Sequence, residues 1–354
     1  MSFPRELPVS SHYRLWYLLG AVCSKLEQVA KTPAMPEEHA RIAADYMVLG
    51  VQATCAIHGN SMRESEIREI EAKAEPQGAR ECEISNVLQA CHALVRVSRR
   101  STPPALDADY ICRINATILN GLELEEGAQA GVPVDENAAR KLGEYCAWLE
   151  SETFRAAESM RMTMALLKAA LAHVYLLWIS PFAEGNARTA RLVEYMLLLQ
   201  AGVPAPAAAL PGMHYSRTQE QFRSRLAELE QPGEQNFDRF LIYALQGFSE
   251  GLDTLLARQR ECTLESAWTN HVHAVFRGTL IEKTAKRRRA LLLSMPATPV
   301  EITKYRDLPQ ELYYEYYKNK SLRTLTRDLA ELVDMGLLEH TESGYRARRE
   351  LMQG

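Results

Sequence analysis

The sequence predicts an all-α protein with one short mixed segment near its C-terminus. Long segments repeat apolar residues at three- to four-residue spacing, the pattern of helices that bury one face. Proline and glycine stretches such as Pro103-Pro104 and Gly131-Val132-Pro133 fall between these segments. Before the last stretch the chain lacks the alternating pattern of half-buried strands. The clearest predicted helices span residues 38–57, 84–97, 138–150, 160–179 and 189–201.

The apolar N-terminal segment, Leu15 to Ser24, is predicted to be a core-facing helix. It lacks both the basic leader and the small-residue cleavage site of a signal peptide. No apolar run approaches the length of a membrane span, so no membrane association is expected. The seven cysteines are odd in number and contain no CxxC pair, which predicts free thiols in the reducing cytoplasm.

Three segments are predicted: an N-terminal helix over 1–34, a large helical domain over 35–262 and a small domain over 263–354. The net charge of the chain is −4, which excludes a strongly basic nucleic-acid-binding protein. From residue 267 onward, however, 15 Lys or Arg stand against 11 Asp or Glu. The small domain is therefore mildly basic.

The last segment has the pattern of a winged helix-turn-helix. Ser321 is placed to cap a helix that Gly336 ends, and two short strands can follow around a turn at Ser343-Gly344. Such domains read the DNA major groove with their second helix. The outward face of that helix would present Arg323, Thr324 and Arg327 to DNA. Alternatively, these side chains are solvated and the domain packs against a protein partner.

The strongest chemical signal is the segment SPFAEGNARTAR at residues 180–191, which lies between two predicted helices. Free backbone amides and the helix dipole at the start of the second helix form an anion site. Arg188 and Arg191 lie three residues apart and can hold further phosphate oxygens. Glu184 supplies an oxygen ligand of the kind that Mg²⁺ prefers. The residues alone therefore predict a site for nucleotide phosphates.

This segment resembles the motif His-Pro-Phe-x-Asp/Glu-Gly-Asn-Gly-Arg-x-x-Arg of the Fic (Fido) family. The resemblance extends over about residues 35–262 and implies an all-α Fic-type domain, to which bacterial members often add a winged helix. It also implies transfer of AMP, or a related group, from ATP to a protein hydroxyl with Mg²⁺ as cofactor. The implied catalytic positions are Ser180, Glu184, Asn186 and Arg188; the nucleotide-binding positions are Gly185, Asn186, Ala187, Arg188 and Arg191; and the metal ligand is Glu184.

Two departures from the family pattern concern its chemistry. Ser180 stands where the family has the His that deprotonates the target hydroxyl, and a hydroxyl has no useful basicity near neutral pH. Upstream, Thr54, His58 and Gly59 fit the family's autoinhibitory motif except that His58 replaces its Glu. In the family this Glu pairs with the second motif arginine, here Arg191. The resemblance thus implies that both the base and the inhibitory carboxylate are missing.

Several interpretations stay open at this point. The chain is an AMP transferase with impaired or altered chemistry, or a non-catalytic nucleotide-binding regulator that acts through its winged helix on DNA or a protein. A further alternative makes His58 the base from across the site. The acidic segment 122–134, where the family has a target-docking flap, is predicted to be a small hairpin or a loop. The protein target and the oligomeric state, a homo-oligomer included, are not predicted.

Overall fold

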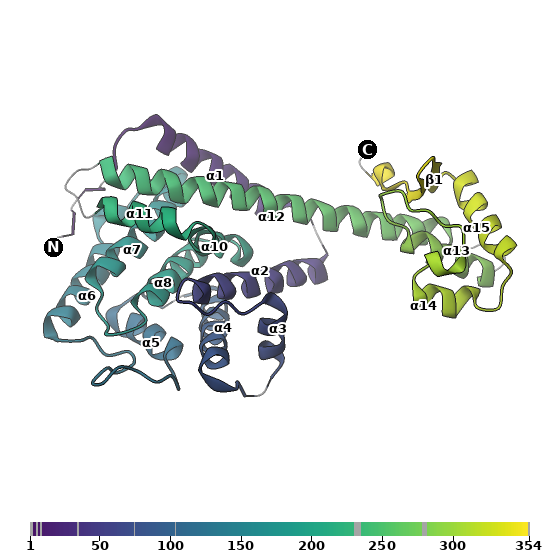
Figure 1. Ribbon diagram of the computed structural model, residues 1–354. Coiled ribbons are helices and arrows are strands. Elements are labelled where there is room, and N and C mark those ends of the chain that lie inside the picture. The colour runs from purple at the N-terminus through teal and green to yellow at the C-terminus, as the bar shows by residue number, and fades with distance from the viewer. Residues whose placement is uncertain are drawn as a thin grey trace. The chain divides into compact units, whose positions relative to one another are not determined.

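The computed structural model describes residues 3–4, 6–7, 9–33, 35–73, 75–102, 104–229, 235–277 and 282–352. It confirms the all-α prediction (Figure 1). The helices of the first part are α1 (Tyr13–Lys31), α2 (Pro36–Ala56), α3 (Glu64–Ala72), α4 (Gly78–Ser98), α5 (Ala108–Ile118), α6 (Glu136–Leu149), α7 (Arg161–Ile179), α8 (Asn186–Gln200), α9 (Ala205–Ala208), α10 (Leu210–Arg217) and α11 (Gln219–Leu229). The remaining elements are α12 (Gln235–Val275), α13 (Glu282–Ser294), α14 (Gln310–Leu312), α15 (Leu322–Asp334), β1 (Leu338–Thr341) and β2 (Gly344–Ala347).

The chain divides into two compact units, one formed by residues 1–32 and 36–257 and the other by 33–35 and 258–354. The boundary lies inside α12, which continues from the first unit into the second. The sequence-based boundary at 262/263 also falls inside this helix. Since α12 has no break in its backbone there, no loop marks where one unit ends. The N-terminal helix predicted over 1–34 is α1, which packs against α7 as part of the first unit.

At the centre of the first unit, α7 and α8 pack along each other, with α4, α5 and α6 around them (Figure 1). Most of α7 is apolar on every face, because its neighbours cover it on several sides. By length and hydropathy, residues 158–179 would suffice to cross a membrane, which corrects the expectation that no apolar run approaches that length. Slightly more than half of this segment is buried inside the unit, as is typical of a core helix. The expected absence of membrane association stays a prediction.

The second unit contains the predicted helix and hairpin. β1 and β2 pair antiparallel, with Leu338 opposite Ala347 and Thr341 opposite Gly344. Gly344 has a φ of +120°, and a Cβ there would lie 2.2 Å from the carbonyl oxygen of Val300, so a side chain is excluded. The predicted hairpin is confirmed, but its turn lies at Glu342-Ser343, one residue earlier than predicted, because Gly344 already pairs with Thr341 in the ladder. Assignment of the unit as a winged helix stays a prediction.

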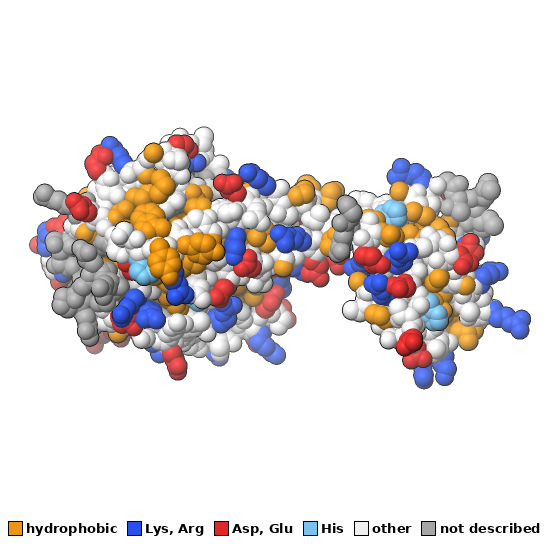
Figure 2. Space-filling model, turned by 90° about the horizontal axis from the view of Figure 1, so that it is seen from above, with side chains coloured by type: hydrophobic (Ala, Val, Ile, Leu, Met, Phe, Trp, Pro, Cys, Tyr) orange, Lys and Arg blue, Asp and Glu red, His pale blue; other side chains and the backbone are white. Residues whose placement is uncertain are grey.

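Apolar side chains are also exposed on the first unit. Tyr13 and Tyr17 of α1 are 81% and 73% exposed, respectively. Figure 2 looks onto the face that carries α1 and shows hydrophobic side chains gathered there. All seven cysteines are free thiols, four of them buried, as the sequence predicts.

Candidate functional site

The motif loop begins at a sharp turn at the end of α7. Ser180 has a φ of +45°. Among the described residues it is the only one other than glycine with a left-handed backbone. Its amide donates to the carbonyl of Leu176, which closes the last helical turn. A left-handed residue after a helix reverses the chain direction. The turn leaves the Ser180 side chain exposed at the mouth of the loop.

Asn186 holds the loop in shape. Its Oδ1 accepts from the amide of Phe182 at 3.0 Å, and its Nδ2 donates to the carbonyl of Phe182 at 2.6 Å. Gly185 precedes α8 with a φ of +77°, and a Cβ there would lie 2.9 Å from Nδ2 of Asn115. The first amides of α8, from Asn186 to Arg188, have no acceptor within the helix and face the loop. They are the amides of the predicted anion site, which stays a prediction.

Asn115 of α5 supports this loop from below, and sequence reasoning missed it. It is fully buried, and its Nδ2 donates to the carbonyl of Glu184 at 2.9 Å and to Oγ1 of Thr189 at 3.1 Å. Its Oδ1 accepts from the amide of Gly131 at 2.8 Å. One side chain therefore joins the motif to the acidic segment 122–134. An asparagine inside an amphipathic helix gives no sequence signal of this role.

The acidic segment lies along the motif as a loop. Val134 donates its amide to the carbonyl of Pro181 at 2.9 Å, and Pro133 makes an antiparallel bridge to Phe182. The described residues of the segment form no hairpin, so of the two predicted forms the structure has the loop. The amide of Glu125 donates to Oε1 of Glu184 at 2.7 Å. This contact fixes the Glu184 carboxylate beside the anion site.

The two motif arginines have different partners. Nη1 of Arg188 lies 2.5 Å from Oε1 of Glu83, a residue of α4 that sequence reasoning did not single out. The other oxygen of Glu83 accepts from Nδ2 of Asn60 at 2.8 Å. Arg191 is only 5% exposed and donates from Nη1 to the carbonyl of Thr54 at 2.9 Å. Burial lowers the pKa of Arg191 to about 10, so its guanidinium stays charged at neutral pH.

Both guanidinium groups keep an open donor. The Nε atoms of Arg188 and Arg191 are buried and have no hydrogen-bond partner among the described residues. Buried N–H groups of this kind are rarely left unpaired in native proteins. Both donors are therefore available to an acceptor from outside the chain.

The upstream motif lies against the same arginines. Thr54 is in the last turn of α2, and His58 and Gly59 form the turn after it, with a φ of +87° at Gly59. Burial, followed by the charges of Arg191 and Arg188, lowers the pKa of His58 to about 4. The imidazole is therefore neutral at pH 7. It lies on the side of the site where the arginines would hold phosphates.

A buried polar network lies behind the arginines. Nδ1 of His173 and Oε2 of Glu194 are 2.6 Å apart, and the hydroxyl of Tyr215 donates to Oε1 of Glu194 at 3.0 Å. His173 is fully buried, so it is a core residue rather than a ligand-facing one. Glu194 and Tyr215 were not singled out from the sequence. The network ties α7, α8 and α10 together beneath the site.

The predicted DNA-facing residues lie on α15 of the second unit. Arg323 and Arg327 are exposed, and Thr324 is half-buried. The basic run at residues 283–289 is less available for binding DNA phosphates than its charge suggests. Nε of Arg287 lies 2.6 Å from Oδ2 of Asp328, a fully buried carboxylate, and Arg288 pairs with the same residue at 3.0 Å. These two arginines are structural.

Comparison with known proteins agrees with the motif. Residues 105–198 match the sequence profile of the Fic/DOC family, which confirms the predicted resemblance. The chain is 26% identical over 200 residues to Protein adenylyltransferase Fic of Nematostella vectensis, covering 53% of this chain and 45% of that protein. It thus spans about half the length of this curated relative.

Solved structures share the fold. A Fic family protein from Desulfovibrio desulfuricans G20 has a TM-score of 0.56 at 15% identity and covers 97% of this chain and 98% of its own. Fic-1 from C. elegans has a TM-score of 0.58 at 18% identity and covers 70% of this chain and 73% of its own. These likenesses establish a Fic-type helical fold.

Proposed function

From the Fic/DOC match within an all-helical Fic-type fold, we propose that this protein binds ATP at the motif loop and transfers AMP weakly to a protein hydroxyl. The observation that carries the proposal is the pair of open Nε donors on Arg188 and Arg191 beside the amides of α8. Positive charge, open donors and a helix N-terminus together match the chemistry of phosphate. The curated relative named as an adenylyltransferase supports ATP as the nucleotide.

Mg²⁺ is part of the proposal, with Glu184 as its protein ligand. The described residues contain no group of three or more acidic, His or Cys side chains able to hold a metal ion by themselves. Magnesium usually binds one or two carboxylates together with substrate phosphates and water. Glu184 fits that role because Oε2 is left without a described hydrogen-bond partner while Oε1 is fixed by the amide of Glu125. The ion would neutralise phosphate charge there.

The weakness of transfer rests on position 180. Ser180 occupies the family's base position, and a positioned general base contributes roughly 10²–10⁴-fold to a rate. His58 is a poor replacement, since an imidazole with a pKa of about 4 is a weak base and lies beside the phosphate-binding arginines. Altered chemistry, in which the target nucleophile arrives already activated, is the remaining route to full activity.

The proposal includes the loss of the family's autoinhibitory carboxylate. Where the family has an inhibitory Glu, this chain has His58, which is neutral at pH 7 because its pKa is about 4. A neutral imidazole forms no ion pair with Arg191, whose Nη1 is instead bound to the carbonyl of Thr54. The γ-phosphate of ATP therefore meets no carboxylate from this motif.

The test is incubation with Mg²⁺ and ATP labelled on either the α- or the γ-phosphate. The unmodified protein is expected to retain nucleotide but to gain little covalent label. Ser180→His is expected to raise covalent α-label by at least about tenfold, within the range for a restored base. Ser180→Ala, the matched control, stays at the basal level. Adding His58→Glu to Ser180→His returns the label toward that level.

Three results contradict the proposal. Strong α-labelling by the unmodified protein would point to altered chemistry rather than to a missing base. Absence of retained ATP in all variants would remove the site itself. Covalent γ-label without α-label would show phosphoryl transfer instead of AMP transfer.

A second candidate is a nucleotide-responsive regulator that binds DNA. The exposed Arg323 and Arg327 on α15, followed by the β1–β2 hairpin, favour it. If these side chains bind phosphates, affinity falls by about 0.9 log unit per log unit of salt for each phosphate neutralised. Replacing both with Gln is then expected to reduce the salt slope by about 2. Binding that ignores salt, or no binding to genomic fragments, leaves the second unit as a protein-interaction module.

A further inference from the structure

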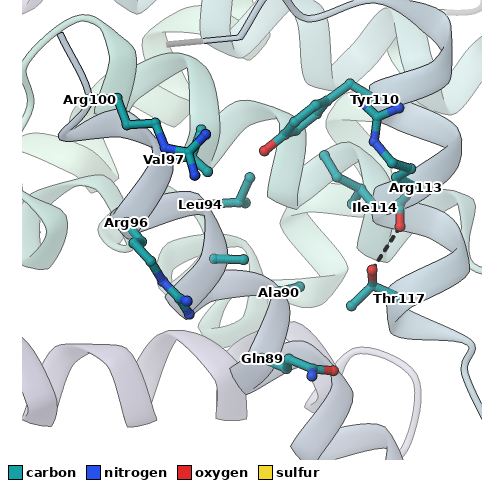
Figure 3. Close-up of a pocket in the computed structure, with 11 residues that line it drawn as sticks. Gln89, Ala90, Leu94, Arg96, Val97, Arg100, Tyr110, Arg113, Ile114 and Thr117 are labelled. Carbon is teal, nitrogen blue, oxygen red and sulfur yellow. Dashed lines mark hydrogen bonds between the residues drawn. The ribbon is translucent and has the colours of Figure 1, made fainter. Parts of the chain in front are cut away.

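A pocket of about 480 Å³ opens between α4 and α5, with its own set of lining residues separate from the motif loop. Its volume falls in the range of small-molecule sites, which is roughly 300–1,000 Å³. The floor is apolar and formed by short side chains together with Leu94, Val97 and Ile114. Figure 3 shows these side chains between the two helices.

Three arginines surround this floor. Arg96 lies in α4, Arg100 lies two residues after the end of α4, and Arg113 lies in α5. None of the eleven lining residues is acidic. None of the three guanidinium groups forms an ion pair with any residue that the structure describes. The pocket is therefore a concentration of positive charge without an internal counter-ion.

Tyr110 lines the same pocket with its aromatic ring and its hydroxyl group. The guanidinium carbon of Arg113 lies 5.0 Å from the centroid of its ring, and Figure 3 shows the hydroxyl turned toward the space between the helices. Burial raises the pKa of Tyr110, against the opposing effects of Arg113 and Arg100. The phenol is therefore protonated at neutral pH and can donate a hydrogen bond. The cation–π contact also orients Arg113.

In a second arginine-rich pocket, most of the arginines form ion pairs with carboxylates of the same chain. It has about 670 Å³ and includes Arg217 and Arg225. There, Arg225 lies 2.8 Å from Glu228 and Arg217 lies 4.0 Å from Glu250. Arg239 also lies 3.8 Å from Glu228, so three of the four arginines that line this pocket have a carboxylate within 4.0 Å. The fourth, Arg14, donates to the side-chain oxygen of Gln246. The pocket between α4 and α5 differs because its arginines have no such partners.

We propose that the pocket between α4 and α5 binds a small organic phosphate whose apolar or aromatic body lies on the Leu94–Ile114 floor. Guanidinium groups bind phosphate in a bidentate manner, so the arginines that line this pocket suit an anionic head group. A bare inorganic ion is not expected to be the best ligand, because it has no apolar surface to bury against the floor. This site is independent of the function proposed for the motif loop.

The test is calorimetric titration of the full chain with methylumbelliferyl phosphate. The titrated protein carries Glu83→Gln and Arg188→Gln, which removes one motif arginine together with its partner and so weakens binding at the motif loop. One probe per chain is expected to bind. Methylumbelliferone, which lacks the phosphate, and inorganic phosphate, which lacks the body, are each expected to bind at least about tenfold more weakly, or ~1.4 kcal/mol.

Two kinds of variant probe the charge and the floor separately. Replacing Arg96, Arg100 and Arg113 together with Gln removes the charge and is expected to weaken the probe by at least about tenfold. Ala93→Trp fills the floor while keeping the charge, with the same expected loss. Arg99→Gln is the matched control, because Arg99 is an exposed arginine of the same helix end that does not line the pocket. It is expected to leave the affinity unchanged.

Parallel titrations with adenosine monophosphate and with octyl phosphate identify the body that fits, purine or alkyl chain. The proposal is overturned if methylumbelliferyl phosphate fails to saturate the protein. It is equally overturned if the triple Gln variant and Ala93→Trp both bind the probe as tightly as Arg99→Gln does. Equal affinity for methylumbelliferone and its phosphate would also exclude an anion site.

Discussion

The ion pair between Glu83 and Arg188 is expected to be a main support of the motif loop. Their side chains are only 14% and 11% exposed, so the pair is shielded from most of the surrounding water. Removing one partner of a fully buried pair costs about 3–5 kcal/mol, whereas exposed pairs contribute about 0–1 kcal/mol. With some exposure remaining, Glu83→Gln is expected to lower the free energy of unfolding by about 2 kcal/mol.

The assay is a double-mutant cycle in urea, with Glu83→Gln, Arg188→Gln and both together. The double variant is expected to be more stable than the sum of the single changes predicts, because neither charge is then left alone. A coupling of about 1–3 kcal/mol is expected. The control cycle uses Arg140 and Glu144, an exposed ion pair of the same residue types on α6. Its coupling is expected to be about 0.3–0.5 kcal/mol.

The same variants test how the pair affects nucleotide binding. The Glu83 carboxylate is the counter-ion that a phosphate reaching Arg188 must compete with. Glu83→Gln is therefore expected to tighten ATP binding by about tenfold, or ~1.4 kcal/mol. A coupling no larger than that of the exposed control pair would refute the structural argument. Weaker ATP binding by Glu83→Gln would show that Glu83 orients Arg188 rather than competing with phosphate.

Three further predictions follow from single contacts. Arg188→Gln is expected to weaken ATP binding by at least about tenfold in calorimetry, whereas Arg140→Gln changes it little. Gly247→Ala places a Cβ 2.1 Å from the ring of His214, so unfolding in urea is expected to show a loss of about 1–3 kcal/mol. Gly143→Ala, whose Cβ meets nothing within 4 Å, is expected to gain up to about 1 kcal/mol from helix propensity. Burial, with Arg217, lowers the pKa of His214 from 6.5 to about 4, so the unfolded state binds the extra proton between these values. Stability is expected to fall as pH drops from 6.5 toward 4, and His214→Gln reduces that slope.

The fold was predictable because its signals are local. The apolar repeat of 160–179 predicts a helix, and the structure has one over Arg161–Ile179. The following loop was predictable for the same reason, since Pro181, Gly185 and the arginines lie within one short stretch. Helix periodicity and turn residues act over a few positions, which a sequence displays directly.

The supports of the site were not predictable, because they come from distant parts of the chain. Glu83 is 105 residues from Arg188, and Asn115 is 69 residues from Glu184. Nothing in the local pattern around Glu83 distinguishes it from Glu81, the other acidic residue of α4. Their contacts depend on how α4, α5 and α8 pack. The motif predicts which side chains meet a ligand, but not which side chains hold them.

Charge counting failed for a related reason in the second unit. The basic run at 283–289 reads as a solvated surface when each Lys and Arg contributes one exposed charge. In the structure Asp328 lies 41 residues from Arg287 and neutralises it inside the core, with the hydroxyl of Tyr317 as a third partner at 3.1 Å. A buried carboxylate requires such partners. Part of the positive charge of the second unit is therefore neutralised by ion pairs inside that unit.

Binding and transfer are separable properties of this site. The groups that would hold phosphate are the α8 amides and the two arginines, whereas the base position is Ser180. Exchanging His for Ser at position 180 removes a proton acceptor but no positive charge at neutral pH. Replacing the inhibitory Glu with His58 removes a negative charge, since its pKa of about 4 leaves the imidazole neutral. Both departures therefore leave phosphate attraction intact or strengthen it, while only the first slows the chemistry. A protein with these two changes is expected to bind ATP but to transfer AMP from it slowly.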